Sequence, residues 1–249
     1  MARFKTISAR DLEYDMPLIR RSLQPFLPAN NDAEILDIGC GYGALVHCLS
    51  QLGYTRVRGV DRCAEMAEIA RSLGITSVQI GDFIETLVRN PSRYQLIIGF
   101  DIIEHQRKQD VLPILDAIFH ALVPGGTVLI QTPNAMSHYG LGYRYGDFTH
   151  ELIFDAGSIR QVLAAARFSD VRVLPVPPCA RGLLSAIRRV LWAIREPWLK
   201  LVFAIEAGWT SGQVFTPNLL AAGYKPCALE VPTPELTAQS ELACVHRTR

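Results

Sequence analysis

Apolar residues follow two different spacings along most of the chain. Short continuous runs of Val, Ile and Leu are typical of buried strands, whereas apolar residues every three or four positions indicate helices. Strands are predicted at residues 35–38, 57–60, 77–80, 95–100, 127–132, 171–174 and 218–226. Helices are predicted at residues 10–27, 44–52, 64–73, 83–89, 111–122 and 158–166. This alternation predicts an α/β fold, with a parallel sheet covered by helices on both faces.

The alternation is interrupted after the sixth strand. PVPPCARG, residues 175–182, is typical of a linker, and apolar residues at helical spacing follow over residues 183–209. Pro197 is expected to break this stretch into two helices. Arginines are interspersed, and all three tryptophans (Trp192, Trp198, Trp209) lie here. We interpret the stretch as a cap that packs on the domain or on a second subunit, with peripheral contact to an anionic membrane through residues 182–209 as the alternative.

These patterns predict one α/β domain with a helical insertion between strands six and seven. A leading helix occupies residues 1–30, and the domain itself covers residues 31–176 and 213–226. The cap covers residues 177–212, and a C-terminal tail without an assigned function covers residues 227–249.

Composition argues against several classes of protein and site. A chain of 249 residues that is 49% apolar can bury a sizeable core. A net charge of +1 and the absence of a basic stripe argue against a nucleic-acid partner. The six scattered cysteines form no CxxC pair, which favours a reducing compartment over a structural zinc site. No apolar signal core or span of about 20 residues is present, so a cytoplasmic protein is expected, with membrane association left open.

Carboxylates follow the first three strands, at the edge of the sheet where α/β folds bind ligands. In ILDIGCGYG, residues 35–43, the glycines permit a tight turn, and Asp37 precedes them. A carboxylate there would repel a pyrophosphate but suits an ammonium group, and the G-x-G-x-G spacing differs from the dinucleotide motif. Asp61, which ends VRGVD, can accept hydrogen bonds from ribose hydroxyls. GDF offers Asp82 for an adenine amino group and Phe83 for stacking.

Five motifs together resemble the class I S-adenosylmethionine-dependent methyltransferases, over residues 33–175: ILDIGCGYG, VRGVD, GDF, YQLIIGFDIIEH and LVPGGTVLIQTPN. The resemblance implies a Rossmann-like, doubly wound sheet of seven strands with the last strand antiparallel. It also implies that Asp37 and the glycine turn hold the methionine portion of S-adenosylmethionine, Asp61 the ribose, and Asp82 and Phe83 the adenine. The residues expected to bind this cofactor are Asp37, Gly39, Cys40, Gly41, Gly43, Asp61, Arg62, Asp82, Phe83, Phe100, Asp101 and His105.

GFDIIEHQ, residues 99–106, ends the fourth strand, beside the expected methyl group. If the chain turns helical from Asp101, then Asp101, Glu104 and His105 share one face. Two carboxylates and an imidazole suit Mg²⁺ or Mn²⁺, and His150 in the loop after the fifth strand would be a fourth ligand. The set resembles ubiquinone-pathway and small-RNA 2′-O-methyltransferases, which carry E-x-x-E-H, a distant His and a divalent metal. Here Asp101 replaces the first Glu and shortens that arm.

Three interpretations of this cluster stay open. It holds a metal, or it is metal-free with His150 or His105 as proton acceptor, or Glu104 caps a helix while His105 contacts the cofactor and His150 packs near the loop. Asp147, in the same loop as His150, is a further catalytic candidate. Either functional version activates a hydroxyl, which is a poor nucleophile until its proton is taken or its pKa falls.

The acceptor is expected to meet the loop of residues 133–150. Tyr139, Tyr143 and Tyr145 suit a sugar or a flat ring equally. DFTHELIF resembles methyltransferases found among bacterial glycan and cell-envelope genes. We therefore expect an O-methyltransferase for a hydroxyl of a sugar, glycan or glycolipid. The alternatives are a phenolic or quinone-like small molecule, RNA, which is disfavoured, and a binding module that has lost its chemistry.

Overall fold

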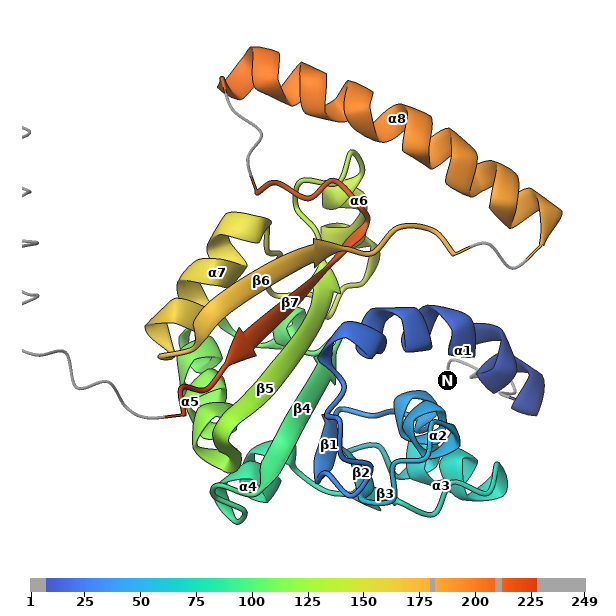
Figure 1. Ribbon diagram of the computed structural model, residues 1–249, viewed down its shortest axis with the longest axis vertical. Coiled ribbons are helices and arrows are strands. Elements are labelled where there is room, and N and C mark those ends of the chain that lie inside the picture. The colour runs from blue at the N-terminus through green and yellow to red at the C-terminus, as the bar shows by residue number, and fades with distance from the viewer. Residues whose placement is uncertain (1–7, 180–181, 209–211, 228–249) are drawn as a thin grey trace, which may run out of the picture.

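A single seven-stranded sheet forms the centre of the protein. The computed structural model describes residues 8–179, 182–208 and 212–227. The strands are β1 Ile35–Ile38, β2 Val57–Asp61, β3 Val78–Ile80, β4 Tyr94–Phe100, β5 Leu122–Pro133, β6 Ser169–Pro175 and β7 Asn218–Tyr224. Their order is β3-β2-β1-β4-β5-β7-β6 (Figure 1). The pairs among β1 to β5 are parallel, and β7 runs antiparallel to both β5 and β6. The predicted doubly wound sheet with an antiparallel last strand is confirmed.

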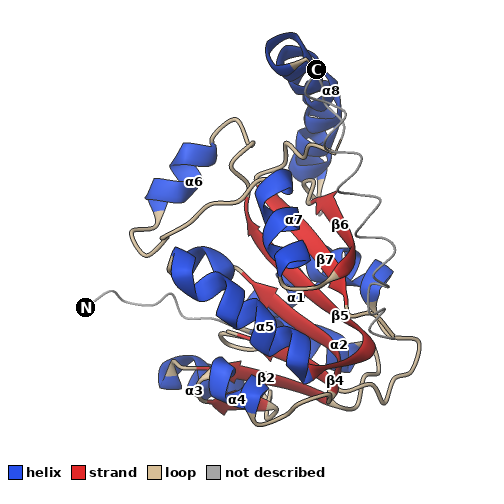
Figure 2. Ribbon diagram, turned by 90° about the vertical axis from the view of Figure 1, so that its left-hand side faces the viewer, coloured by secondary structure: helices blue, strands red, loops and turns tan. Residues whose placement is uncertain are grey.

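Helices cover both faces of this sheet (Figure 2). They are α1 Ala9–Leu23, α2 Ala44–Gln51, α3 Ala64–Ser72, α4 Phe83–Val88, α5 Val111–Ala121, α6 Gly140–Gly146, α7 Ala156–Ala165 and α8 Leu183–Ala207. Short 3₁₀ turns lie at Gln24–Phe26, Ile103–His105 and Lys108–Asp110.

Two hydrophobic cores form because successive strand residues point to opposite faces. Leu36 and Ile97 belong to the core that includes residues of α4, α5 and α7. Their chain neighbours Ile35 and Leu96 belong to the core that includes residues of α1, α2 and α3. The continuous apolar runs that predicted the strands are therefore explained by burial on both faces.

The stretch after β6 differs from its prediction. Pro197 lies inside α8, which is one helix of 25 residues, so the predicted break into two helices is wrong. A proline removes only one backbone donor, and good helix formers such as Ala, Leu and Arg on both sides continue the helix across it. Figure 1 shows α8 crossing the top of the molecule, beyond the edge of the sheet. Among the described residues, none of the helices combines the length and the hydrophobicity that a membrane span requires.

Two further differences concern helix α6 and the start of β5. The loop of residues 133–150, here called the tyrosine-rich loop, contains the short helix α6, which was not predicted. Strand β5 begins five residues before its predicted start. Trp209 and the predicted tail from residue 228 onward lie outside the described residues.

Candidate active site

The turn after β1 is tightly packed on one side and open on the other. Gly39, Gly41 and Gly43 all have positive φ angles, of 64°, 52° and 80°, which favour glycine. A Cβ at Gly39 would lie 1.9 Å from Ile102 Cδ1, whereas a Cβ at Gly41 would have no atom within 4 Å. The turn therefore rests on Ile102 and leaves space above Gly41, where a ligand can approach the backbone.

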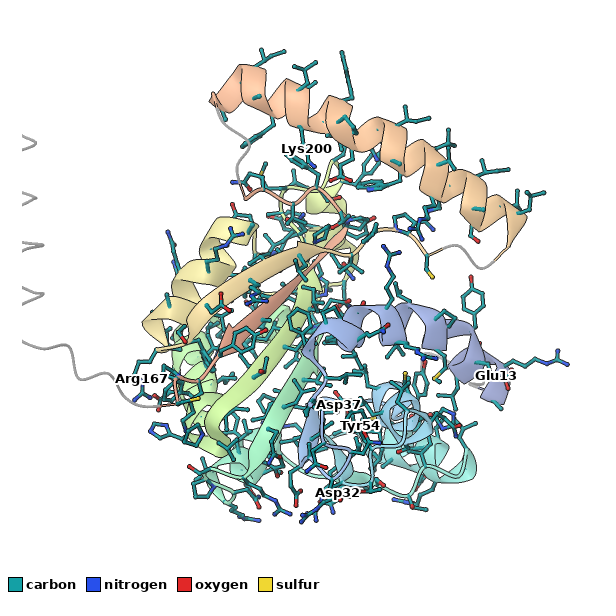
Figure 3. All side chains as sticks on the ribbon, viewed as in Figure 1. Glu13, Asp32, Asp37, Tyr54, Arg167 and Lys200 are labelled. Carbon is teal, nitrogen blue, oxygen red and sulfur yellow. The ribbon has the colours of Figure 1, made fainter. Side chains whose placement is uncertain are left out.

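Asp37, just before this turn, is a buried carboxylate without a partner. It is 1% exposed, and neither of its oxygens accepts a hydrogen bond. Figure 3 places it inside the body of the domain. Burial, reinforced by the charge of Asp61, raises the pKa of Asp37 well above its ordinary value. A ligand ammonium group would satisfy these oxygens, as the methionine portion of S-adenosylmethionine can, so the site fits that cofactor.

Asp61, at the end of β2, accepts hydrogen bonds from two loops. Its Oδ2 accepts a hydrogen bond from the Gly41 N–H at 2.8 Å, and its Oδ1 accepts one from the Cys63 N–H at 2.8 Å. A carboxylate oxygen has two lone pairs, so each can accept a further hydrogen bond from a ribose hydroxyl. The side chain of Cys40 is buried against Gly59, where it has a packing role.

Asp82 caps α4 and forms an ion pair with Arg62. Its Oδ1 accepts a hydrogen bond from the Ile84 N–H at 2.6 Å. Burial alone would raise the pKa of Asp82, but the hydrogen bonds from Arg62 and from the first turn of α4 outweigh burial and lower it. The backbone of α4 and the Arg62 side chain already bind the Asp82 carboxylate, so its contact with adenine stays a prediction. Phe83 is only 8% exposed and belongs to the α4–α5–α7 core.

The expected stacking of adenine on Phe83 stays a prediction, and the structure leaves only a small part of the ring accessible to a ligand. Phe83 is the first residue of α4, and its ring packs in the α4–α5–α7 core. Phe100 is half-buried against the α1–α2–α3 core and stays a candidate for the cofactor site.

Glu104, His105 and His150 come together at the end of β4. One ligand atom from each lies within 4.8 Å of the others. The rings of His105 and His150 are 4.7 Å apart between centroids and inclined by 67°. Three of the four predicted metal-site residues are thus brought together by the 3₁₀ turn at Ile103–His105 and by the loop that follows α6.

Hydrogen bonds orient both imidazoles in the same way. His150 Nδ1 lies 2.9 Å from the Tyr143 carbonyl oxygen. His105 Nδ1 lies 3.3 Å from the Thr149 carbonyl oxygen and 2.9 Å from Thr149 Oγ1. A carbonyl oxygen only accepts, so Nδ1 carries the hydrogen in each ring. The Nε2 atom of each neutral imidazole is then a free base or metal ligand.

Glu104 is fully buried beside these rings. It is 0% exposed, its Oε2 accepts a hydrogen bond from Thr132 Oγ1 at 3.1 Å, and its Oε1 has no partner. Burial, with a smaller contribution from the charge of Asp101, raises the pKa of Glu104 to about 7. A buried carboxylate with a free oxygen, beside two imidazoles, fits a hard divalent cation such as Mg²⁺ or Mn²⁺.

Asp101 is not part of this cluster, so the predicted shared face of Asp101, Glu104 and His105 is wrong. Asp101 has a left-handed backbone, with φ at 53°, and the helical turn starts only at Ile103. Its N–H donates to the Gln131 carbonyl at 2.9 Å, and Gln131 Nε2 donates to Asp101 Oδ1 at 3.4 Å. The sharp turn at Asp101 directs its carboxylate to β5 instead. Glu104 lies within the 3₁₀ turn and does not cap it.

Asp147 reaches the cluster through Thr149. Its Oδ1 accepts hydrogen bonds from the Thr149 N–H at 2.9 Å and from Thr149 Oγ1 at 2.7 Å. These bonds lower the pKa of Asp147. Because Thr149 Oγ1 also contacts His105 Nδ1, Asp147 is a positioning residue for His105. Thr149 and Thr132 were not among the predicted site residues, although Thr149 directly precedes His150.

A groove lies between α8 and the tyrosine-rich loop. It is lined by Tyr139, Tyr143, Arg188, Trp192 and Arg195, among others. The Arg195 guanidinium lies 6.0 Å from the ring centroid of Tyr139 and 5.5 Å from that of Trp192. Tyr143 both lines the groove and, through its carbonyl oxygen, holds His150, so the groove is the candidate acceptor site.

Comparisons with known proteins agree with this geometry. A family model described as a methyltransferase domain matches residues 9–173, more than half of the chain. The chain is 32% identical over 108 residues to the ubiquinone biosynthesis O-methyltransferase of Serratia proteamaculans, covering 41% of this chain and 44% of that protein. It is 33% identical over 107 residues to the enzyme of the same name from Xylella fastidiosa strain 9a5c, covering 41% and 42%. The match thus spans less than half the length of these curated relatives.

Solved structures share the fold at low identity. A SAM-dependent methyltransferase from Archaeoglobus fulgidus is 20% identical, with a TM-score of 0.64 over 88% of this chain and 100% of that one. Phosphoethanolamine N-methyltransferase 2 of Haemonchus contortus, in complex with S-adenosyl-L-methionine, is 20% identical, with a TM-score of 0.60 over 84% and 52%. The chain belongs to the class I S-adenosylmethionine-dependent methyltransferases.

Proposed function

We propose that the protein transfers the methyl group of S-adenosylmethionine to a hydroxyl of a sugar, glycan or glycolipid. The observation that carries this proposal is the cluster of Glu104, His105 and His150, which presents two imidazole Nε2 atoms and a buried carboxylate next to the cofactor turn. Such groups serve an acceptor that must lose a proton, as a hydroxyl must.

One set of residues binds the cofactor, and another activates the acceptor. Asp37, Asp61 and the glycine turn hold the cofactor, whose sulfonium already activates the methyl group. The protein then has to place the acceptor oxygen in line with the methyl carbon. His105 or His150 takes the hydroxyl proton at Nε2, and the Tyr143 and Thr149 oxygens keep these rings in the required tautomer.

Glu104, His105 and His150 are the residues that would hold Mg²⁺ or Mn²⁺, which would supply a lower pKa for a bound hydroxyl. The unpartnered Glu104 Oε1 supports this part of the proposal, because a cation would satisfy it.

The residues that line the groove favour a glycan acceptor over a phenolic one. A phenolic acceptor favours a closed apolar pocket, whereas this groove carries Arg188, Arg195 and a Tyr139 side chain that is 64% exposed. Aromatic rings and charged groups together suit the faces and hydroxyls of a sugar. The alternative is a phenolic or quinone-like acceptor, and the similarity to ubiquinone biosynthesis O-methyltransferases favours it.

Transfer of a radiolabelled methyl group from S-adenosylmethionine tests the proposal. The acceptors are a panel of glycans and glycolipids and a catechol, each with Mn²⁺ or with EDTA. We expect label in a sugar hydroxyl with the wild type, and a loss of at least about 100-fold in His150→Ala. His120→Ala is the matched control, since His120 is exposed on α5 and pairs with Asp116.

Label in the catechol alone would replace the glycan with the phenolic acceptor. Equal activity of His150→Ala and wild type would overturn the role of the cluster.

A further inference from the structure

The side of α8 that points away from the domain is apolar and exposed. Large side chains recur along it at Ile187, Val190, Ile194, Trp198, Leu201 and Ile205, which are 47% to 78% exposed. Their spacing of three or four residues places them on one face of the helix, here called the outer face. None of the residues of α8 is buried. Figure 3 shows side chains along this helix pointing away from the sheet.

The opposite side of α8 faces the domain. The ring of Phe203 lies 5.7 Å from that of Phe215, between centroids. Trp192 and Arg195 line the groove beside the tyrosine-rich loop. The helix is thus attached through one side, and its outer face has no cover among the described residues.

We propose that the outer face of α8 binds the interfacial region of an anionic membrane, with the helix lying in the plane of the bilayer. An amphipathic helix with Trp on its apolar face and Lys or Arg elsewhere is suited to that location. At 1.5 Å per residue α8 is about 37 Å long, and its charged residues make it unsuited to spanning. This proposal does not depend on the identity of the methyl acceptor.

Charge complementarity favours the bilayer. The charged residues of α8 are Arg188, Arg189, Arg195, Lys200, Glu196 and Glu206, so the helix carries a net +2 while the whole chain carries +1. Lys200 pairs with Glu196, but no carboxylate pairs with the three arginines in the described part of the chain. Anionic lipid head groups attract such cations near the surface.

The borders of the outer face argue against pairing with a second copy. At 100° per residue the six residues of the outer face span about 80°. Exposed Leu184, Leu191 and Val202 widen the apolar arc to about 120°, which is broader than a strict coiled-coil seam. Arg188, Arg195 and Glu206 lie along one border, and the other border carries Ala186, Ala193 and Ala204. A parallel pair of helices is stabilised by opposite charges on its two borders, and the alanine border carries none.

Membrane docking would also bring the groove to the lipid surface. Arg188 and Arg195 line the groove and lie next to the outer face. An enzyme docked in this way would present the groove to the head groups of the bilayer. A lipid-linked acceptor would then reach the histidine pair from the membrane side.

Flotation of the full chain with vesicles tests the proposal, without cofactor or acceptor. The vesicles contain phosphatidylcholine alone, or phosphatidylcholine with phosphatidylglycerol. Ile194→Glu and Val88→Glu form a matched pair, because both side chains are apolar and 68% exposed, on α8 and α4 respectively. We expect the wild type and Val88→Glu to float with the anionic vesicles, and at least tenfold weaker binding of Ile194→Glu.

Two further measurements keep the test decisive. Stabilisation of each variant by S-adenosylhomocysteine reports the folded cofactor site, so a failed docking proposal is distinguishable from a failed proposed function. Brominated lipid should quench tryptophan fluorescence in the wild type and less in Trp198→Phe.

Docking is overturned if the wild type does not float with anionic vesicles, or if Ile194→Glu floats as well as Val88→Glu. It is also overturned if the wild type is a dimer that Ile194→Glu converts to a monomer, because a second copy then covers the outer face.

Discussion

Glu104→Gln is expected to stabilise the metal-free protein at neutral and alkaline pH. Glu104 is fully buried, receives one hydrogen bond from Thr132 and has one oxygen without a partner. Its ionised form is therefore unfavourable in the fold. Glutamine keeps the shape of the side chain and does not ionise, so the variant removes that unfavourable charge.

The magnitude follows from the pKa of this carboxyl. Burial raises the pKa of Glu104 from its ordinary value of 4.5 to about 7. A carboxyl that binds its proton more tightly in the folded state loses stability as the pH rises. The loss begins near pH 4.5, grows through pH 7 and then stays constant at about 3 kcal/mol. Relative to Glu104→Gln, the wild type should lose about 2–3 kcal/mol between pH 5 and pH 8.5.

Urea denaturation with EDTA measures this difference. The free energies of unfolding of wild type and variant are compared at pH 5, 7 and 8.5. Other titrating groups are common to both proteins, so their contributions cancel in the comparison. Mn²⁺ in place of EDTA should restore the wild type at pH 8.5 and leave Glu104→Gln unchanged. A difference between the two proteins that does not vary with pH would refute the reasoning.

Three more substitutions test separate parts of the account. Asp37→Asn should weaken S-adenosylhomocysteine binding by about tenfold or more without lowering the stability of the ligand-free protein, and calorimetric titration with thermal melts checks both. Asn134→Ala should lower the free energy of unfolding by about 2–4 kcal/mol in urea, since the buried amide makes three hydrogen bonds. Gly39→Ala should destabilise the protein by more than about 2 kcal/mol, because the new Cβ would clash with Ile102. Gly41→Ala, its control, should lose only about 1–2 kcal/mol, from the left-handed backbone alone.

The sheet and the cofactor edge were predictable because their signals are local and repeated. Ile35–Ile38 is an uninterrupted apolar run apart from Asp37, and every residue in it is buried. A strand buried on both faces has that pattern. The carboxyl ends of parallel strands meet at one edge, so the sequence alone places Asp37 and Asp61 together.

The composition of the histidine cluster could be predicted only in part. His105 and His150 lie 45 positions apart, and the resemblance to methyltransferases with E-x-x-E-H and a distant His paired them. The position of Asp101 depends on a left-handed backbone and on a hydrogen bond to Gln131 of the neighbouring strand, and neither has a sequence signal. Pro197 illustrates the converse, since a strong local signal for a break is overridden by the helix formers on either side.

Thermal melting of wild type and His150→Ala tests the central claim most directly. Each protein is measured with S-adenosylhomocysteine, with and without Mn²⁺, and with EDTA. Ligand at 100 times its Kd stabilises a protein by about 2.7 kcal/mol, which raises the Tm by several degrees. We predict an equal shift by S-adenosylhomocysteine in both proteins and an added shift by Mn²⁺ in the wild type alone. No shift by S-adenosylhomocysteine in the wild type, or an equal Mn²⁺ shift in His150→Ala, would contradict the account.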